Sequence, residues 1–295
     1  MKLMSSLCRF QIIRQNKTLY TYIDCVEDLS FLNKELLQKP YLGVDTEFRR
    51  TTKDNMRLAL LQVNDGEEIY LIDAVSINNP EDNCDFLLTN AVTKIFHSCK
   101  EDLEAIYAWT GNVMKNLFDT QLANAFLDGH YSIGYQGLVE EKLDITLDKK
   151  ETRSNWIRRP LSESQLSYAA SDVEYLIHLF IEQERALIES NKLDWHNEDL
   201  ESLIANTFNP STNIEEIGCS LTKSEERNLL NIFNDIVLNI ADREQINPTL
   251  FFSKKSQKEF IRLALNKGSE EALRDLTSWR RLLIRDPLNK LLINY

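Results

Sequence analysis

The first indication of the fold comes from the run Tyr41-Leu42-Gly43-Val44-Asp45-Thr46-Glu47-Phe48. Its apolar residues predict a buried strand, yet a buried strand does not ordinarily carry two carboxylates. Side chains at positions i and i+2 of a strand point to the same face, so Asp45 and Glu47 are expected side by side. Carboxylates that close need a cation, and Mg²⁺ or Mn²⁺ accepts hard oxygen ligands of this kind. The alternative is a strand end whose acids face water, and the pair alone does not decide between the two.

The composition predicts a soluble protein of the cytoplasm. The 295 residues are enough for two domains, and 43% of them are hydrophobic, which is enough for real cores. No run of about 18 apolar residues is present, so we expect no transmembrane helix. Residues 1–17 lack the apolar stretch and cleavage site of a secretory signal. The five cysteines are odd in number and scattered, which favours reduced thiols over disulfides or a zinc site.

The charge is unevenly distributed along the chain. The net charge of −12 argues at first against a nucleic-acid partner, because such partners favour a basic surface. Residues 221–295, however, carry a local balance of +3, which leaves −15 for residues 1–220. Clustered carboxylates that hold divalent ions would neutralise part of that acidity.

Strand and helix patterns predict an α/β domain over residues 15–192. Asp65-Gly66 is a strong hairpin signal, so the strands on either side of it should be antiparallel. Later strands alternate with helices, which indicates a mixed sheet. The expected strands are 18–24, 41–48, 57–64, 67–73, 93–97 and 117–118, and the expected helices are 25–38, 81–91, 101–109 and 120–128.

The remainder predicts a linker and a helical module. Residues 193–220 are acidic and interrupted by Pro210 and Gly218, so we expect a linker with at most one short helix near 198–206. Apolar residues then recur at helical spacing, which predicts a small all-α domain over 221–295. Its expected helices are 222–242, 254–266 and 270–285, with Pro248 and Pro287 at helix starts.

Two further acids lie where partners of the first pair would be useful. Asp102 follows His97 by five residues, at the expected start of a helix, where a negative charge also suits the helix dipole. Tyr168 and Asp172 are four apart on an expected long helix and therefore share one face. A capping acid and an ordinary amphipathic helix are the respective alternatives. The order of these residues along one α/β domain favours a shared site.

With these residues in place, the chain resembles the DEDD superfamily of 3′→5′ exonucleases, in the subclass whose third motif is Y-x-x-x-D, and within it ribonuclease D. The resemblance covers roughly residues 18–190. It extends beyond the acids to three other stretches, which are Phe118–Ala123, Gly134–Val139 and Leu147–Ser162. It implies a ribonuclease H-like exonuclease domain.

The resemblance also implies a site for two divalent metal ions, Mg²⁺ or Mn²⁺. By resemblance, Asp45, Glu47 and Asp172 hold the ion that activates water. Asp45 also bridges to a second ion, which Asp102 supports, and Tyr168 orients the attacking water. Phosphodiester hydrolysis requires a nucleophilic water, a stabilised transition state and a charged leaving oxygen, and two ions about 4 Å apart serve all three needs.

A basic strip precedes the helix that carries Tyr168. Residues 149–159 hold five basic residues against one acid, with an embedded tryptophan, and this composition suits phosphate contact and base stacking. A solvated loop is the alternative, and core packing is favoured for the tryptophan. His97 is expected to be structural. The expected RNA contacts are Phe48, Lys149, Arg153, Trp156, Arg158 and Arg159.

The C-terminal module resembles the HRDC domain, a nucleic-acid-binding accessory found in ribonuclease D and some helicases. The match runs from Lys223 to Leu292, and Leu276–Arg280 is its most distinctive part. Ribonuclease D of the well-known bacterial type has two such domains, whereas the residues here fit one. That difference bears on how strongly a substrate is gripped and leaves the acids untouched.

These observations predict a metal-dependent 3′→5′ exoribonuclease that releases nucleoside 5′-monophosphates. The resemblance implies RNA with a free 3′ end as the substrate, in particular tRNA precursors, with no membrane and no obligate protein partner. A DNA exonuclease shares the same acids and remains an alternative. A non-catalytic RNA-binding scaffold is the alternative from another class, and the intact acid set disfavours it.

Overall fold

The computed structural model describes residues 11–15, 18–52, 55–147, 151, 154–209 and 221–293. The chain divides into two compact units. The first comprises Met1–Gln121 and Ile133–Glu182, and the second comprises Leu122–Ser132 and Gln183–Tyr295. Within the described part of the chain, no helix is both long and apolar enough to cross a membrane.

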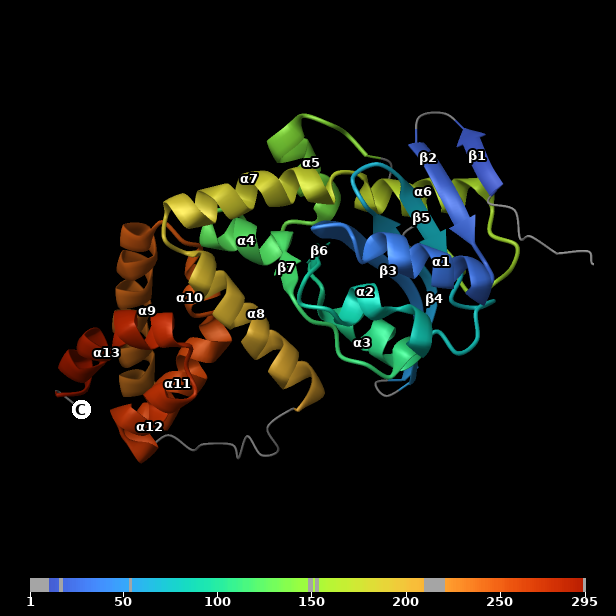
Figure 1. The fold of residues 1–295 in the computed structure, drawn as a ribbon. Helices are drawn as coiled ribbons and strands as arrows, with labels where there is room; N and C mark the ends of the chain where they lie inside the picture. Colours follow the sequence, from blue (N-terminus) through green and yellow to red (C-terminus); the bar gives the residue numbers. More distant parts are fainter. Residues whose placement is uncertain are drawn as a thin grey trace, which may run out of the picture. The chain divides into compact units, whose positions relative to one another are not determined.

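A mixed sheet forms the centre of the first unit (Figure 1). The seven strands that the structure describes lie in the sheet in the order β1-β2-β5-β4-β3-β6-β7. Pairing is parallel between β2 and β5, β3 and β6, and β6 and β7, and antiparallel elsewhere. The strands are β1 (Gln11–Gln15), β2 (Thr18–Ile23), β3 (Tyr41–Thr52), β4 (Asn55–Asn64), β5 (Ile69–Ile72), β6 (Thr93–Phe96) and β7 (Leu117–Asp119).

The β4–β5 hairpin confirms the antiparallel connection expected at Asp65-Gly66. Gly66 has φ +91°, a left-handed conformation that glycine adopts without steric cost. The Asp65 carboxylate accepts hydrogen bonds from the backbone N–H groups of Glu67 and Glu68, at 2.9 and 2.8 Å. The edge strand β1 was not expected from the sequence pattern.

Helices cover the sheet. Helix α3 packs against β3 and β4, and α6 packs against β2 to β5. Buried leucines and isoleucines of β3, β4 and β5 form the core between these layers. The helices up to this point of the chain are α1 (Val26–Leu36), α2 (Asp85–Leu88), α3 (Lys100–Thr110), α4 (Thr120–Phe126), α5 (Tyr135–Leu143), α6 (Glu163–Glu174) and α7 (Leu176–Glu189), of which α4 and α7 have residues in both units.

Two helix predictions in this unit were wrong. The helix expected at 81–91 is a short 3₁₀ turn (Glu81–Asn83) followed by the four-residue α2. The long helix expected to carry Asp172 is interrupted at Tyr175, between α6 and α7. Neither proline nor glycine occurs at that break.

The second unit is helical and has an aromatic core. Trp279 is buried and stacks on Trp195, with ring centroids 5.1 Å apart and an interplanar angle of 11°. Asp199 accepts hydrogen bonds from the Trp279 indole and the Arg280 guanidinium. The helices are α8 (Leu193–Phe208), α9 (Lys223–Glu244), α10 (Pro248–Phe251), α11 (Lys254–Lys267), α12 (Ser269–Arg274) and α13 (Ser278–Leu292).

The linker prediction was wrong for its first half. Residues 193–208 form α8. The acidic composition suggested a linker, but Asp199 of this helix accepts a hydrogen bond from Arg280 of α13, far along the chain. Residues 210–220 lie outside the described residues. The single helix expected at 270–285 is two helices, α12 and α13, and Pro287 lies inside α13 instead of at a helix start.

Candidate active site

Strand β3 presents the first two acids on one face. The antiparallel register pairs Asp45 with Gln62 and Glu47 with Leu60, so the two acids lie two positions apart on a regular stretch, as their spacing predicted. The parallel pairing of β3 with β6 covers only Tyr41–Gly43. The acids therefore follow the point where β6 ends. The carboxyl end of parallel strands is where open α/β sheets form their binding crevices.

Helix α3 brings Asp102 to the same region. The Thr46 hydroxyl donates to the Asp102 carboxylate at 2.5 Å, which ties β3 to the first turn of α3. The turn before α3 is held by buried Asp119, which accepts hydrogen bonds from the backbone N–H groups of Ser98 (3.0 Å) and Cys99 (2.8 Å). The sequence analysis did not predict these bonds of Thr46 and Asp119, because long-range hydrogen bonds have no local signal.

Helix α6 supplies the remaining pair. Ser162 and Gln165 form a capping box that sets the start of the helix. Tyr168 and Asp172 share a face, and the Tyr168 hydroxyl hydrogen-bonds to the Asp172 carboxylate. Ala169 and its neighbour Ala170 are fully buried, and their small side chains let α6 approach the sheet closely.

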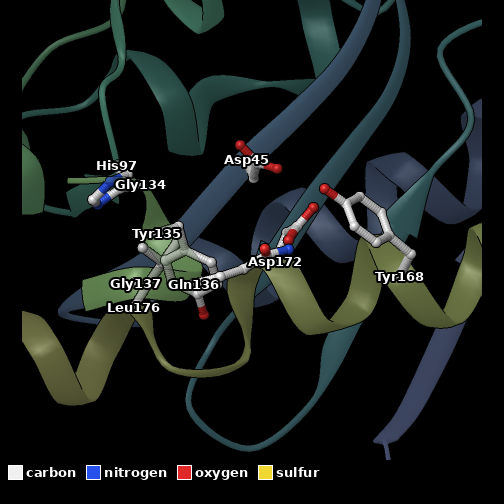
Figure 2. A pocket seen from close by; sticks show the side chains of 9 residues that line it. All are labelled: Asp45, His97, Gly134, Tyr135, Gln136, Gly137, Tyr168, Asp172 and Leu176. Atoms are coloured by element: carbon white, nitrogen blue, oxygen red, sulfur yellow. The ribbon is translucent and has the colours of Figure 1, made fainter. Parts of the chain in front are cut away.

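A pocket of about 330 Å³ opens between these elements. Figure 2 shows Asp45, Asp172 and Tyr168 approaching one another on one side, with His97 and Tyr135 on the other. The lining residues are Asp45, His97, Gly134, Tyr135, Gln136, Gly137, Tyr168, Asp172 and Leu176. Glu47 and Asp102 are not among the lining residues, but the charge of the lining residue Asp45 raises the pKa of both.

Burial raises the pKa of all four acids, and the charges of neighbouring acids add to the rise for Asp45, Glu47 and Asp102. Burial, and then the charges of Asp45, Asp172 and Asp102, raise the pKa of Glu47 to about 10. Burial raises the pKa of Asp172 to about 7, although the bond from Tyr168 opposes this rise. Burial and the charge of Asp172 raise the pKa of Asp45 well above its ordinary range, and burial together with Asp45 does the same for Asp102. The protein thus gathers four acids whose charged forms are costly without a cation.

The donor set fits divalent cations by its chemistry. All four groups are hard oxygen donors that disfavour one another, and a 2+ ion would relieve that repulsion. In the part of the chain that the structure describes, no three His, Cys, Asp or Glu side chains converge as closely as a preformed metal cage requires.

The opposite wall of the pocket contains His97 and Tyr135, neither of which was predicted as a site residue. His97 contacts the Thr120 hydroxyl through Nδ1 and the Ile133 carbonyl through Nε2, each at 2.9 Å. Burial lowers the pKa of His97, and its Nε2 donates to the Ile133 carbonyl. Its role is structural, as expected. Tyr135 packs its ring at an angle to His97, with centroids 5.9 Å apart.

The expected RNA contacts have varied surroundings. Lys149 and Arg153 lie outside the described residues. Phe48 is half-buried beside a β-bulge that follows Glu47, and Arg158 is exposed. Trp156 is only 4% exposed and packs against Tyr168, with ring centroids 6.1 Å apart.

Arg159 forms an ion pair with Asp73 inside the first unit. Its guanidinium donates to both oxygens of buried Asp73, at 2.7 and 2.5 Å, and to the carbonyls of Ala59 (2.8 Å) and Trp156 (2.6 Å). Burial alone would raise the pKa of Asp73, but bonds from Arg159, Tyr22 and Ser76 outweigh it and lower that pKa. The Arg159 guanidinium is therefore engaged inside the protein, which argues against the predicted contact of Arg159 with RNA.

Comparison with known proteins shows which protein family the chain resembles. A model of the 3′–5′ exonuclease family matches residues 20–187. Ribonuclease D of Pseudomonas paraeruginosa is 42% identical over 173 residues, which cover 59% of this chain and 46% of that protein. The chain thus spans about half the length of the curated relatives it matches.

Solved structures agree with the fold. The crystal structure of Escherichia coli RNase D, described as an exoribonuclease involved in structured RNA processing, superposes with a TM-score of 0.62. The two chains are 25% identical, and the match covers 93% of this chain and 74% of that one. Brucella melitensis NrnC with bound Mg²⁺ has a similar fold, with a TM-score of 0.54 and 24% identity over 66% of this chain and 97% of that one.

Proposed function

This chain belongs to the 3′–5′ exonuclease family, and we propose that it is a metal-dependent exoribonuclease that removes nucleoside 5′-monophosphates from RNA 3′ ends. The observation that carries the proposal is the gathering of Asp45, Glu47, Asp102 and Asp172 in one region of the first unit, where burial raises the pKa of all four. The similarity to ribonuclease D over about 60% of the chain supports RNA as the substrate.

Each side chain has a distinct task in this proposal. Asp45, Glu47 and Asp172 would hold one divalent ion, and Asp45 with Asp102 would hold a second. Such ions, when bound, lower the pKa of water and neutralise charge that develops on the phosphate. Tyr168 orients the attacking water by hydrogen bonding, and its bond to Asp172 keeps the phenol in place. Thr46 holds the Asp102 carboxylate in place by its hydrogen bond.

The basic residues would serve substrate binding. Arg158 is exposed just before α6, where its charge can contact the RNA backbone. Phe48 follows Glu47 directly and can touch the terminal base. For Trp156, packing against Tyr168 is the role that its burial supports, so it would act on RNA only through that tyrosine. Lys149 and Arg153 remain predictions from the sequence.

The deciding experiment is release of mononucleotides from single-stranded RNA with a 3′ hydroxyl. We expect 5′-monophosphates with Mg²⁺ or Mn²⁺, none with EDTA, and none from Asp45→Ala. Matched single-stranded DNA serves as the competing substrate, and faster loss of DNA would overturn the RNA assignment. Binding of RNA without mononucleotide release under either metal would leave only a scaffold role.

The finer proposal is that the substrates include tRNA precursors with extra 3′ nucleotides. It rests on the resemblance to ribonuclease D and concerns the whole protein. Its test is the digestion of a tRNA transcript with a short 3′ extension. We expect digestion to stop near the end of the acceptor stem, and equally fast degradation of an unrelated hairpin with the same extension would remove the preference.

A further inference from the structure

The helix that carries Asp172 is interrupted by a side chain from another element. Helix α6 ends at Glu174, α7 begins at Leu176, and Tyr175 lies between them. In an uninterrupted α-helix the N–H of Tyr175 would donate to the carbonyl of Ser171, four residues earlier. Here the Tyr175 N–H donates to the Tyr135 hydroxyl at 2.9 Å, and it also reaches the carbonyl of Val173.

The same hydroxyl completes the other half of the missing bond. Tyr135 donates from its hydroxyl to the carbonyl of Ser171 at 3.3 Å. One phenol thus accepts from the residue three after Asp172 and donates to the residue just before it. Insertion of a polar group between a carbonyl and the N–H four residues later is a recognised cause of helix breaks.

We propose that Tyr135 is a positioning residue that sets the place of Asp172 by inserting its hydroxyl into the break between α6 and α7. The two hydrogen bonds fix the backbone on both sides of Asp172. The ring is held in turn by its edge contact with His97. Figure 2 shows Tyr135 and Asp172 in the wall of the same pocket.

The fold around the break does not depend on Tyr135 alone. Asn64 donates from its side-chain amide to the carbonyls of Val173 (3.0 Å) and Glu174 (3.2 Å). Gly43, the register partner of Asn64, leaves room there, because a Cβ atom at that position would lie 3.3 Å from the Val173 carbonyl oxygen. Removal of the Tyr135 hydroxyl should therefore loosen Asp172 while the helices stay docked.

This inference rests on the proposed metal site, and its test uses metal binding in addition to turnover. We expect Tyr135→Phe to bind Mn²⁺ about ten-fold more weakly by calorimetry, in line with other residues that orient metal ligands. Turnover should fall while KM for RNA changes little. In an Asp172→Asn background, Tyr135→Phe should have no further effect on Mn²⁺ affinity.

Tyr22→Phe is the matched control. This variant also loses a hydrogen-bonded hydroxyl in the same unit, since the Tyr22 hydroxyl donates to Asp73 at 2.7 Å. Arg159 still binds the Asp73 carboxylate in the variant. We expect this variant to bind Mn²⁺ as the wild type does. Equal loss of Mn²⁺ affinity in both variants would overturn the positioning role.

A measurement on the wild type tests the insertion without any substitution. The Tyr175 amide should be protected from hydrogen exchange, and Tyr135→Phe should lose that protection. Free exchange at Tyr175 in the folded wild type would overturn the inference. If the wild type binds no Mn²⁺ and releases no nucleotide, both the proposed function and this inference are overturned. If Tyr135→Phe binds Mn²⁺ as the wild type does, only this inference is overturned.

Discussion

The hydroxyl of Thr46 donates to the carboxylate of Asp102 across 56 residues of sequence, and this bond joins the central strand to the helix that carries the third acid. Thr46 lies between Asp45 and Glu47 and points to the opposite face of β3. One short stretch of strand therefore carries two of the four acids and holds a third in place.

Thr46→Val should separate the positioning of Asp102 from the chemistry of the other acids. Valine keeps the shape of threonine but cannot donate, so Asp102 loses the partner that fixes its rotamer. We expect hydrolysis to fall about ten-fold, an effect typical of residues that orient metal ligands. Thr46→Ser keeps the donor and should retain most activity. Equal kinetics for Val and wild type would show that the bond does not matter.

Asp45→Asn and Glu47→Gln should each abolish hydrolysis without loss of folding. Either substitution removes metal-binding charge, and a loss of several kcal/mol of transition-state stabilisation lowers the rate on the order of 10³-fold. Because each also relieves repulsion among buried carboxylates, the melting temperature of the metal-free protein should stay constant or rise. Unfolding of either variant would contradict the assignment.

Metal-free protein should lose stability as the pH rises from about 5 to 7. The pKa of Asp172 is about 7 and that of Glu47 about 10 in the folded protein, whereas unfolded carboxyl groups titrate near pH 4. Within this window the folded state keeps protons that the unfolded state has lost, so the free energy of unfolding falls with a slope of about 1.4 kcal/mol per proton and pH unit.

Thermal unfolding in EDTA at several pH values measures this slope. Mg²⁺ should flatten it, because a bound cation replaces the protons, and Asp172→Asn should make it shallower without metal. A free energy of unfolding that rises steadily from pH 5 to 7 in EDTA would refute the prediction.

Arg159 and Arg158 should behave differently although they are adjacent. Arg159→Met leaves the buried Asp73 carboxylate without its cation, and breaking such a pair costs about 3 kcal/mol of unfolding free energy. Replacing Asp73 by Asn in the same protein should restore part of that loss. Chemical denaturation measures both effects, and a stable Arg159→Met variant would return Arg159 to the candidate RNA contacts.

Arg158→Ala should leave the melting temperature unchanged and weaken RNA binding. The side chain is exposed, and loss of a single phosphate contact to single-stranded RNA lowers the salt dependence of binding by about 0.7 in the logarithmic slope. Titration of RNA at several salt concentrations measures this change. An unaltered slope would exclude Arg158 from the backbone contacts.

Local patterns predicted much of the sheet and the helices. The i, i+2 spacing of Asp45 and Glu47 placed both on one face of a strand, and Asp65-Gly66 predicted the hairpin. The four-residue spacing of Tyr168 and Asp172 placed them on one helix face. These features depend on periods of two and about 3.6 residues, which sequence carries directly.

The reactive side chains, and the helices and strands that carry them, can thus be found from the amino-acid pattern alone. Which of these side chains meet depends on how the chain folds. Arg159 reads as a free cation until folding brings it to Asp73, 86 residues away. Nothing local to Tyr175 stops the helix that carries Asp172, since the break is made by a hydroxyl from position 135. Bonds between distant residues have no period in the sequence, because they depend on how the elements pack.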